Sequence, residues 1–215
     1  MKLRQWIRRG EDWWARERLR RRGLGWLIDH IIAANKNTGA HGIDYPGMLR
    51  LYDVLRKIMP DTVWEFGSGT STHFIAHALK DNGRGILHSM ESEHTWAENT
   101  RRCIPKSLAS FCDVIESPSE YLTLNGTDVC RHTVVPDAVP QVVYLDGPFL
   151  PSACQGAIDL LAVEERFAPG AIIVVDGRDR NVAYLLKHFR RKWTLDSILG
   201  PSGIAKPQHF LELTA

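Results

Sequence analysis

The sequence predicts an α/β protein whose sheet is mostly parallel, doubly wound and covered by helices on both faces. Short apolar runs rich in valine, isoleucine and leucine alternate with longer stretches of helical composition. Because the runs are apolar almost throughout, they are typical of strands buried on both faces. Parallel strands need crossover connections, which the intervening helices would provide. Five parallel strands are expected at residues 62–66, 85–90, 111–115, 141–145 and 171–175.

The segments between and after these strands complete the sheet and its cover. Residues 116–140 contain Asn125-Gly126, a favoured pair for a two-residue turn, and are predicted to form a hairpin insertion. Two more strands, at 193–199 and 210–213, would close one edge and bring the sheet to seven strands. Helices are expected at 72–80, 94–103, 152–167 and 181–191.

Residues 1–44 are expected to form an N-terminal helical extension of a domain that spans residues 45–215. The first 22 residues contain nine basic and three acidic residues, a charge of +6, whereas the remainder carries −4. Four of the seven tryptophans lie in the first 26 residues. Apolar residues spaced three and four apart predict helices at 24–32 and, after a turn at 45–47, at 48–58.

The composition excludes several classes of protein. Hydrophobic residues make up 44% of the 215 residues and charged residues 24%, a mixture typical of a folded globular chain. The longest stretch without Asp, Glu, Lys or Arg, residues 66–79, is shorter than the roughly 20 residues of a membrane-spanning helix. The four cysteines lack the paired spacing of zinc ligands and the density of a disulfide scaffold. A cytoplasmic protein with reduced thiols is therefore expected.

The first strand ends in a glycine-rich turn that opens a helix, with the sequence E-F-G-S-G-T-S-T at residues 65–72. Ligands of open α/β sheets bind at the carboxyl ends of the strands. Glycines there let the backbone approach a ligand, and amides at a helix N-terminus favour an anionic group. Thr72 replaces the third glycine of the dinucleotide-binding pattern, and the Gly-Lys-Ser/Thr of a P-loop is missing. The turn therefore disfavours NAD and nucleoside triphosphates.

Other strand ends carry polar residues at the same edge of the sheet. Glu91 ends the second strand, 24 positions after Gly67, where a carboxylate can accept hydrogen bonds from both hydroxyl groups of a ribose. Polar residues also follow the third, fourth and fifth strands, at Ser119, Asp146 and Asp176. A glycine turn coupled to an acid at this spacing predicts a nucleotide-containing cofactor.

Taken in the order in which they occur along the chain, these strand ends resemble the motifs of class I S-adenosylmethionine (SAM)-dependent methyltransferases. The acid before the glycines and the Ser-Thr pair after them resemble the first motif, and D-G-P at residues 146–148 resembles the fourth. The resemblance covers residues 45–215 and implies a Rossmann-like fold with SAM as the cofactor. It implies that Gly67, Ser68, Gly69 and Ser71 hold the methionine part, with Glu65 near its amino group, Glu91 at the ribose, Ser119 at the adenine edge and Asp146 facing the transferable methyl group.

Asp146 and Asp176 also resemble two positions of catechol-type small-molecule O-methyltransferases, in which two aspartates and an asparagine bind a divalent cation. Gly177 stands where the asparagine is expected. Magnesium prefers octahedral oxygen ligation, so the loss of one of three protein ligands weakens such a site. A divalent metal is therefore not favoured and no metal ligand is assigned. The two aspartates would instead orient substrate hydroxyl groups, or Asp176 would only cap the following turn with Arg178 and Asp179.

Methyl transfer to a hydroxyl group requires alignment and a base that removes the proton. The candidates for the base are Asp146, His73 and His132. The predicted function is SAM-dependent O-methylation of a small-molecule or glycan hydroxyl. RNA methylation is the alternative suggested by the arginine-rich N-terminus, although residues 146–149 lack the Asn-Pro-Pro-Tyr type of ending found in base N-methylases. A non-catalytic Rossmann-like binding module is the third hypothesis.

The N-terminal segment also predicts a partner. Several apolar residues lie on one side of a helix whose other side is basic, namely Leu3, Trp6, Ile7, Trp13 and Trp14. Such a helix can pack on its own domain or on a second copy in a homodimer, or it can lie on an anionic membrane surface. Gly10 interrupts the apolar side and three acids dilute the charge, so packing is favoured over peripheral membrane contact. Nucleic acid ranks below both.

Overall fold

The computed structural model describes residues 2–36, 42–151, 154–198 and 207–214. Within these residues, seven strands form one sheet in the order β3-β2-β1-β6-β7-β9-β8. The neighbours from β3 to β7 are parallel, whereas β9 is antiparallel to both β7 and β8. The strands are β1 (Thr62–Phe66), β2 (Ile86–Glu91), β3 (Cys112–Glu116), β6 (Val142–Leu145), β7 (Ile172–Asp176), β8 (Trp193–Ile198) and β9 (Gln208–Leu213). The expected mostly parallel seven-stranded α/β fold is therefore confirmed.

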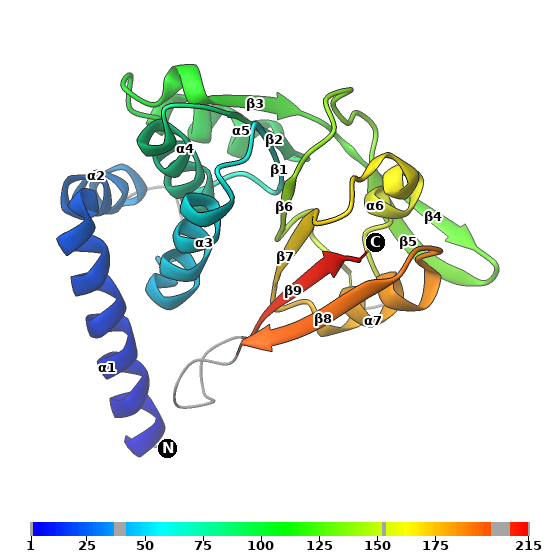
Figure 1. Cartoon of the computed structure of the whole chain (residues 1–215), viewed down its shortest axis with the longest axis horizontal. Helices are drawn as coiled ribbons and strands as arrows, with labels where there is room; N and C mark the ends of the chain where they lie inside the picture. Colours follow the sequence, from blue (N-terminus) through cyan, green and yellow to red (C-terminus); the bar gives the residue numbers. More distant parts are fainter. Residues whose placement is uncertain (1, 37–41, 152–153, 199–206, 215) are drawn as a thin grey trace.

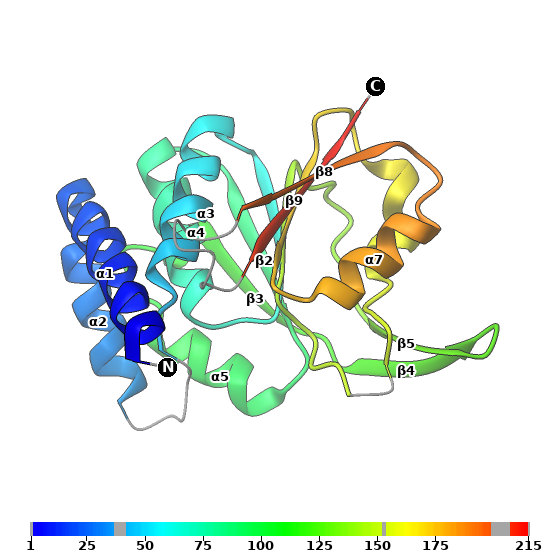
Figure 2. The same ribbon diagram turned by 90° about the horizontal axis from the view of Figure 1, so that it is seen from below.

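Helices cover both faces of the sheet (Figures 1 and 2). Side chains of α1 to α4 share one hydrophobic cluster with one face of the sheet, and side chains of α6 and α7 share a second cluster with the other face. The helices are α1 (Lys2–Leu19), α2 (Gly25–Asn35), α3 (Tyr45–Ile58), α4 (Thr70–Asn82), α5 (His94–Cys103), α6 (Asp159–Val163) and α7 (Asp179–His188). Among the described residues, no helix is both long and apolar enough to cross a membrane.

Alternate residues of β1 show why the strands are mostly apolar. Val63 packs in the cluster with α1 to α4, whereas Trp64 and Phe66 pack in the cluster with α6 and α7. Successive side chains of a strand point to opposite faces, so a strand covered on both sides needs apolar residues at nearly every position, and among the buried residues of β1 only Glu65, between Trp64 and Phe66, departs from this. The central strand thus positions the glycine turn that follows it between two rigid layers.

The predicted hairpin insertion is present as β4 (Ser119–Leu124) and β5 (Thr127–His132), which pair in antiparallel fashion. Asn125 and Gly126 form the two-residue turn with φ values of 51° and 75°. Positive φ at both positions is typical of a type I′ turn, for which Asn-Gly is the preferred sequence. The hairpin projects away from the sheet, beside α7 (Figure 2).

The helix expected at 152–167 is much shorter than predicted. Residues 152 and 153 lie outside the described part of the chain, and the helical part is limited to α6 and a 3-10 turn, η3 (Glu164–Arg166). Residues before α6 run alongside β5, because the amide of Cys130 donates to the Gly156 carbonyl and the amide of Ile158 donates to the Cys130 carbonyl. This strand-like pairing replaces the first turns of the expected helix.

The N-terminal helices differ from expectation in two details. A π-helical segment, η1 (Arg20–Leu24), joins α1 to α2, and Gly23 within it has a φ of 85°, which bends the chain. The segment 45–47, expected as a turn, is instead the first turn of α3, where Pro46 fits because amides of a first helical turn have no partner within the helix. A short 3-10 turn, η2 (Ala109–Phe111), precedes β3.

Candidate functional site

A cleft of about 570 Å³ opens at the carboxyl ends of β1, β2, β6 and β7. The strand order reverses here, because β1 lies between β2 and β6, and open α/β sheets bind ligands at such points. Residues from α1 and from the start of α3 form part of the wall. The lining includes Arg8, Asp12, Asp44, Gly67, Ser68, Gly69, Ser71, Glu91, Trp96, Tyr144, Asp146, Asp176 and Arg178.

The glycine turn after β1 touches the loop after β6 through two glycines. Gly67 has a φ of 92°, and a Cβ atom there would lie 2.9 Å from the backbone of Gly147. A Cβ atom on Gly147 would lie 2.5 Å from the amide nitrogen of Gly67. At Gly69, by contrast, a Cβ atom would meet nothing within 4 Å. The turn is therefore held tightly on one side and leaves its backbone open on the other.

Glu91 is buried at the end of β2 and connects this strand to the glycine turn. One carboxylate oxygen, Oε2, accepts hydrogen bonds from the Ser68 amide at 2.8 Å and from the Ser68 hydroxyl at 3.1 Å. The other, Oε1, accepts from the amide of Glu93 at 3.0 Å. The fold thus brings together the turn and the acid that the sequence predicted as a pair, and both line the cleft. The assignment of Glu91 to a ribose stays a prediction.

Glu65 lies beneath the glycine turn, where its side chain is fully buried and does not line the cleft. Its Oε2 accepts hydrogen bonds from the hydroxyls of Thr72 and Ser89, both at 2.6 Å, and Thr72 in turn accepts one from the amide of Gly69. Burial raises the pKa of Glu65 to about 7, although the surrounding hydroxyl groups lower it. The expected place near a cofactor amino group remains untested, and the contacts seen are with the turn itself.

The pKa of Glu65 predicts a pH-dependent stability. In the unfolded chain this carboxyl has a pKa of 4.5, and in the folded protein its pKa is about 7. The folded state therefore binds the proton more tightly, and stability is lost as the pH rises from about 4.5 to 7, by about 3 kcal/mol in total. Glu65→Gln stays neutral and should lack this loss.

The measurement is urea-induced unfolding of both proteins across this pH range. Glu98→Gln, which changes an exposed carboxylate on α5, is the matched control and should leave the wild-type profile unchanged. Parallel pH profiles for the wild type and Glu65→Gln would show that the buried carboxyl does not titrate in this range.

Asp146 is the first residue after β6, and its carboxylate is exposed in the cleft. Asp176, at the end of the neighbouring β7, lines the same cleft. Arg178 follows with a φ of 50° and donates a hydrogen bond to the carbonyl of Pro148, so it links the loop after β7 to the loop that carries Asp146. Burial lowers the pKa of Arg178, and the nearby aspartates oppose that change.

The two histidines named as candidate bases lie away from the cleft, and no described residue of its lining is a histidine. His73 is buried, and its ring nitrogens face the carbonyls of Gly69 at 2.9 Å and Cys103 at 3.2 Å. Burial also lowers its pKa. His132 is buried against Phe66, with 5.2 Å between ring centroids, and lies beside Asp159. The geometry therefore does not support either histidine and leaves Asp146 as the candidate base.

Ser119, expected at an adenine edge, does not line the cleft. It begins β4 and pairs with His132 of β5, so the hairpin fixes its position. Its Oγ atom is buried without a hydrogen-bond partner among the described residues. Trp96 on α5 does line the cleft and offers an aromatic surface there. Trp96 could not be selected from the sequence, because nothing in the spacing of α5 indicates the direction of the indole.

The N-terminal helices are expected from the sequence to contribute to the acceptor site, and three residues of the first 44 positions line the cleft, although none of them is named as a candidate. Arg8 and Asp12, one turn apart on α1, line it together with Asp44. Burial raises the pKa of Asp44, and the carboxylate of Asp176 raises it further. Asp44 precedes the proline-containing start of α3, which is a recognisable signal for a helix N-terminus. No comparable signal marks Arg8 or Asp12.

The acidic side chains of the cleft do not form a metal-ligand group. Among the described residues, no three His, Cys, Asp or Glu side chains are arranged to hold an ion. Gly177, next to Asp176, has a φ of 69° and provides no side-chain oxygen. The residues present therefore do not fit the three-ligand site of the catechol-type enzymes.

Comparisons with known proteins bear on the family and the fold. A family model described as a methyltransferase domain matches residues 64–177. A structure from Klebsiella pneumoniae, provisionally described as an O-methyltransferase, superposes with a TM-score of 0.60 at 15% identity, covering 87% of this chain and 90% of that one. A search of curated protein sequences gave no match.

Two further structures share the fold. The O-methyltransferase of Bacillus cereus, in complex with SAH, has a TM-score of 0.58 at 13% identity and covers 87% of this chain and 90% of its own. The O-methyltransferase TomG of Streptomyces achromogenes, in complex with SAM and involved in tomaymycin synthesis, has a TM-score of 0.54 at 17% identity, with coverages of 87% and 89%. At these identities the likeness shows a shared fold. The family match spans more than half of the chain and includes the glycine turn and the strand ends, so this protein belongs to the methyltransferase-domain family and is a class I SAM-dependent methyltransferase.

Proposed function

We propose that this protein transfers a methyl group from SAM to a hydroxyl group of a small molecule or glycan. The observation that carries the proposal is the single cleft that joins the glycine turn, the carboxylate of Glu91 and the carboxylate of Asp146. A carboxylate suited to ribose hydroxyls and a second one at a neighbouring strand end supply the two parts that O-methylation needs, a cofactor site and a base.

The residues of the cleft fit this cofactor. The open space beside Gly69 gives room for a ligand along the turn, and the buried carboxylate of Glu91 lies at the end of the neighbouring strand. Gly67, Ser68, Gly69 and Ser71 would hold the methionine part and Glu91 the ribose. When bound, SAM supplies a methyl group on a positively charged sulfur, which makes it open to in-line displacement.

The acceptor side is formed by the aspartates of the cleft. Asp146 would accept the proton of the acceptor hydroxyl, and its loop is fixed by the hydrogen bond from Arg178 to Pro148. Asp176 and Asp44 line the same cleft and would orient further hydroxyl groups, because carboxylates accept hydrogen bonds from sugars and phenols alike.

Calorimetry followed by a transfer assay tests the proposed function. SAM and its demethylated product SAH should bind, and NAD should not. Tritium from labelled SAM should enter hydroxyl-rich extract fractions, and Asp146→Asn should slow this transfer about 100- to 10,000-fold with an unchanged affinity for SAH. SAM binding without transfer would indicate the non-catalytic module, and transfer into RNA would indicate an RNA methyltransferase. Either result would overturn O-methylation.

Methyl transfer is expected to survive removal of divalent metal ions. Gly177 cannot supply the third side-chain ligand, and the described acids of the cleft are not arranged as a metal site. Assays with EDTA should therefore give nearly the same rate as assays with added magnesium. A loss of activity in EDTA that magnesium restores would contradict this prediction.

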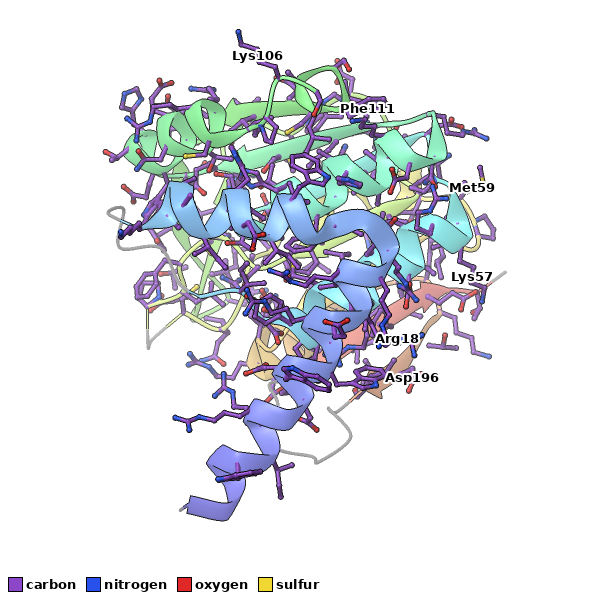
Figure 3. All side chains as sticks on the ribbon, turned by 90° about the vertical axis from the view of Figure 1, so that its left-hand side faces the viewer. Arg18, Lys57, Met59, Lys106, Phe111 and Asp196 are labelled. Carbon is purple, nitrogen blue, oxygen red and sulfur yellow. The ribbon has the colours of Figure 1, made fainter. Side chains whose placement is uncertain are left out.

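The outward face of α1 supports the homodimer that the sequence predicted. Trp6 and Trp13 are 77% and 68% exposed, whereas Ala15 and Leu19 are buried against the domain. Figure 3 views the molecule from the side of α1 and α2, and shows the first half of α1 extending beyond the domain. We propose that these tryptophans pack on a second copy of the chain.

Sedimentation should show the change from dimer to monomer when Trp6 and Trp13 are both replaced by serine. Burial of two indole rings accounts for a large part of a small interface, since aromatic anchors dominate such contacts. Tyr121→Ser, which changes an aromatic residue that is 54% exposed on the hairpin, is the control and should leave the mass unchanged. A wild-type protein that is monomeric and pellets with anionic vesicles would favour the membrane alternative instead.

A further inference from the structure

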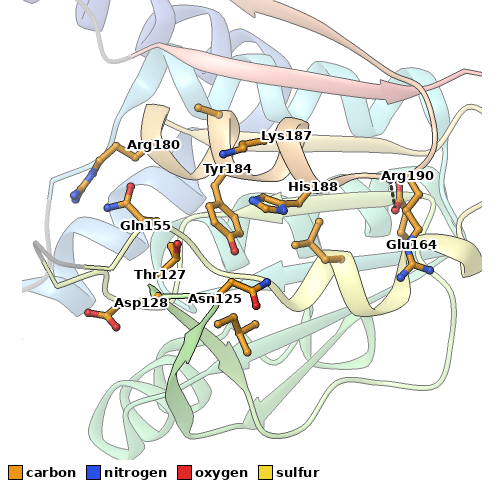
Figure 4. A pocket seen from close by; sticks show the side chains of 14 residues that line it. Asn125, Thr127, Asp128, Gln155, Glu164, Arg180, Tyr184, Lys187, His188 and Arg190 are labelled. Atoms are coloured by element: carbon orange, nitrogen blue, oxygen red, sulfur yellow. Dashed lines mark hydrogen bonds between the residues drawn. The ribbon is translucent and has the colours of Figure 1, made fainter.

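A second cavity, of about 860 Å³, lies between the β4–β5 hairpin and α7. Figure 4 shows it from close by, with the side chains of Tyr184 and Lys187 reaching from α7 and those of Asn125 and Thr127 coming from the hairpin. The cavity belongs to neither the glycine turn nor the strand ends. It exists because the hairpin insertion stands beside α7 and leaves a groove between them.

The groove is polar and contains one aromatic pair. The rings of Tyr184 and His188 lie 4.3 Å apart between centroids. Asn125, Thr127 and Gln155 offer amide and hydroxyl groups, which can both donate and accept hydrogen bonds. Such a mixture of an aromatic face and short polar groups suits a ligand rich in hydroxyl groups.

The charge of the groove favours an anionic ligand. Lys187 and Arg190 are exposed in it. Its buried acid, Glu164, is already used inside the domain, because its carboxylate accepts hydrogen bonds from the amides of Arg190 and Arg191 and from the indole of Trp193. The lining therefore carries three cations, Arg180, Lys187 and Arg190, against two acids, Glu164 and Asp128.

The groove continues toward the methyl-transfer cleft. A smaller hollow of about 360 Å³ shares Leu150 and Arg178 with the cleft and Arg180 with the groove. The three cavities thus follow one another along α7, whose ten residues span about 15 Å. A ligand long enough to pass along the helix could place one hydroxyl beside Asp146 and the rest of its length in the groove.

We propose that this groove binds the extended part of an acidic oligosaccharide, one that carries uronate carboxylates, whose terminal hydroxyl enters the cleft. This assignment rests on the proposed O-methylation and names the acceptor class. Lys187 would pair with a carboxylate, Tyr184 would lie against a sugar ring, and the amides would bind hydroxyl groups.

A single-stranded nucleic acid fits the groove less well than a sugar. Nucleic-acid channels combine basic residues with several aromatic side chains on which successive bases stack. Here the described lining offers one tyrosine, already packed on a histidine, and Asp128 faces the same space. Asp128 accepts hydrogen bonds from sugar hydroxyls, whereas successive bases would need further aromatic faces.

Calorimetry with oligogalacturonate, a uronate oligomer, tests the proposal on the full chain. Lys187→Glu should weaken its binding at least about tenfold, since the change removes a charge-assisted hydrogen bond and adds repulsion. Lys80→Glu, at the end of α4 and outside the groove, makes the same charge change and should have less than about a twofold effect. Tyr184→Ala should weaken binding without a change of charge.

Three outcomes would overturn the acidic-oligosaccharide site. These are no binding of oligogalacturonate by the wild type, equal weakening by Lys187→Glu and Lys80→Glu, and tighter binding of a neutral maltooligosaccharide or of oligouridylate. SAH affinity, measured on the same samples, keeps the two proposals apart. Unchanged SAH binding in Lys187→Glu, together with lost oligosaccharide binding, supports the groove, whereas a wild type that binds oligogalacturonate but not SAH would overturn the proposed O-methylation alone.

Discussion

Replacing Glu91 by alanine is expected to weaken SAM binding by about 2 to 4 kcal/mol, or roughly 30- to 900-fold. The carboxylate is buried at the end of β2 and lines the cleft, so it can offer two charge-assisted hydrogen bonds to a ribose. Glu91→Gln keeps one carbonyl acceptor and should show a smaller loss. Isothermal titration with SAM and SAH measures both variants.

The same carboxylate also stabilises the glycine turn itself, and the experiment must separate this effect from cofactor binding. Its oxygens accept hydrogen bonds from Ser68 and from the amide of Glu93, so Glu91→Ala should lower the unfolding free energy by about 1 to 2 kcal/mol as well. Unfolding curves recorded beside the titrations show the folded fraction. Glu98→Ala on α5 removes an exposed carboxylate and is the control for both measurements. Unchanged SAM affinity in a folded Glu91→Ala protein would contradict the assignment of Glu91 to the ribose.

The strands could be predicted because their physical requirement is local. A strand buried on both faces must be mostly apolar, and β1 was predicted to the residue on that basis, with Glu65 as its buried polar exception. The helix at 152–167 was overestimated because residues 155–158 pair with β5, a segment some 25 residues away, and this contact outweighs local helical preference. The local composition of a segment does not predict that it will pair with a distant strand.

In the site too, features set by local sequence could be predicted, whereas contacts between distant segments could not. The proximity of Gly67, Glu91 and Asp146 could be predicted from the sequence, because parallel strands end at one edge of a sheet. His73 could not be judged from its place beside the turn, because its ring turns back along α4 to the carbonyl of Gly69. Arg8 lines the cleft only because α1 packs on α3, and the helical periodicity of the sequence does not predict which element α1 packs on.

Gly67→Ala is expected to destabilise the protein by about 3 kcal/mol, through two separable causes. The first is the φ of 92°, which an alanine adopts only at a cost of about 1 kcal/mol. The second is the position of the new Cβ atom, 2.9 Å from the backbone of Gly147. Because that neighbour is backbone, it cannot rotate away like the end of a side chain, so the two loops must separate.

Gly170→Ala isolates the first cause. Gly170 has a φ of 85°, and a Cβ atom there would meet nothing within 4 Å, so this variant should lose only about 1 kcal/mol. The difference between the two variants in urea-induced unfolding measures the cost of separating the glycine turn from the loop of Asp146. Because that separation also moves the two sides of the cleft apart, Gly67→Ala should bind SAH more weakly while Gly170→Ala binds it normally. Equal unfolding free energies for the two variants would show that the close approach of Gly67 and Gly147 has no energetic weight.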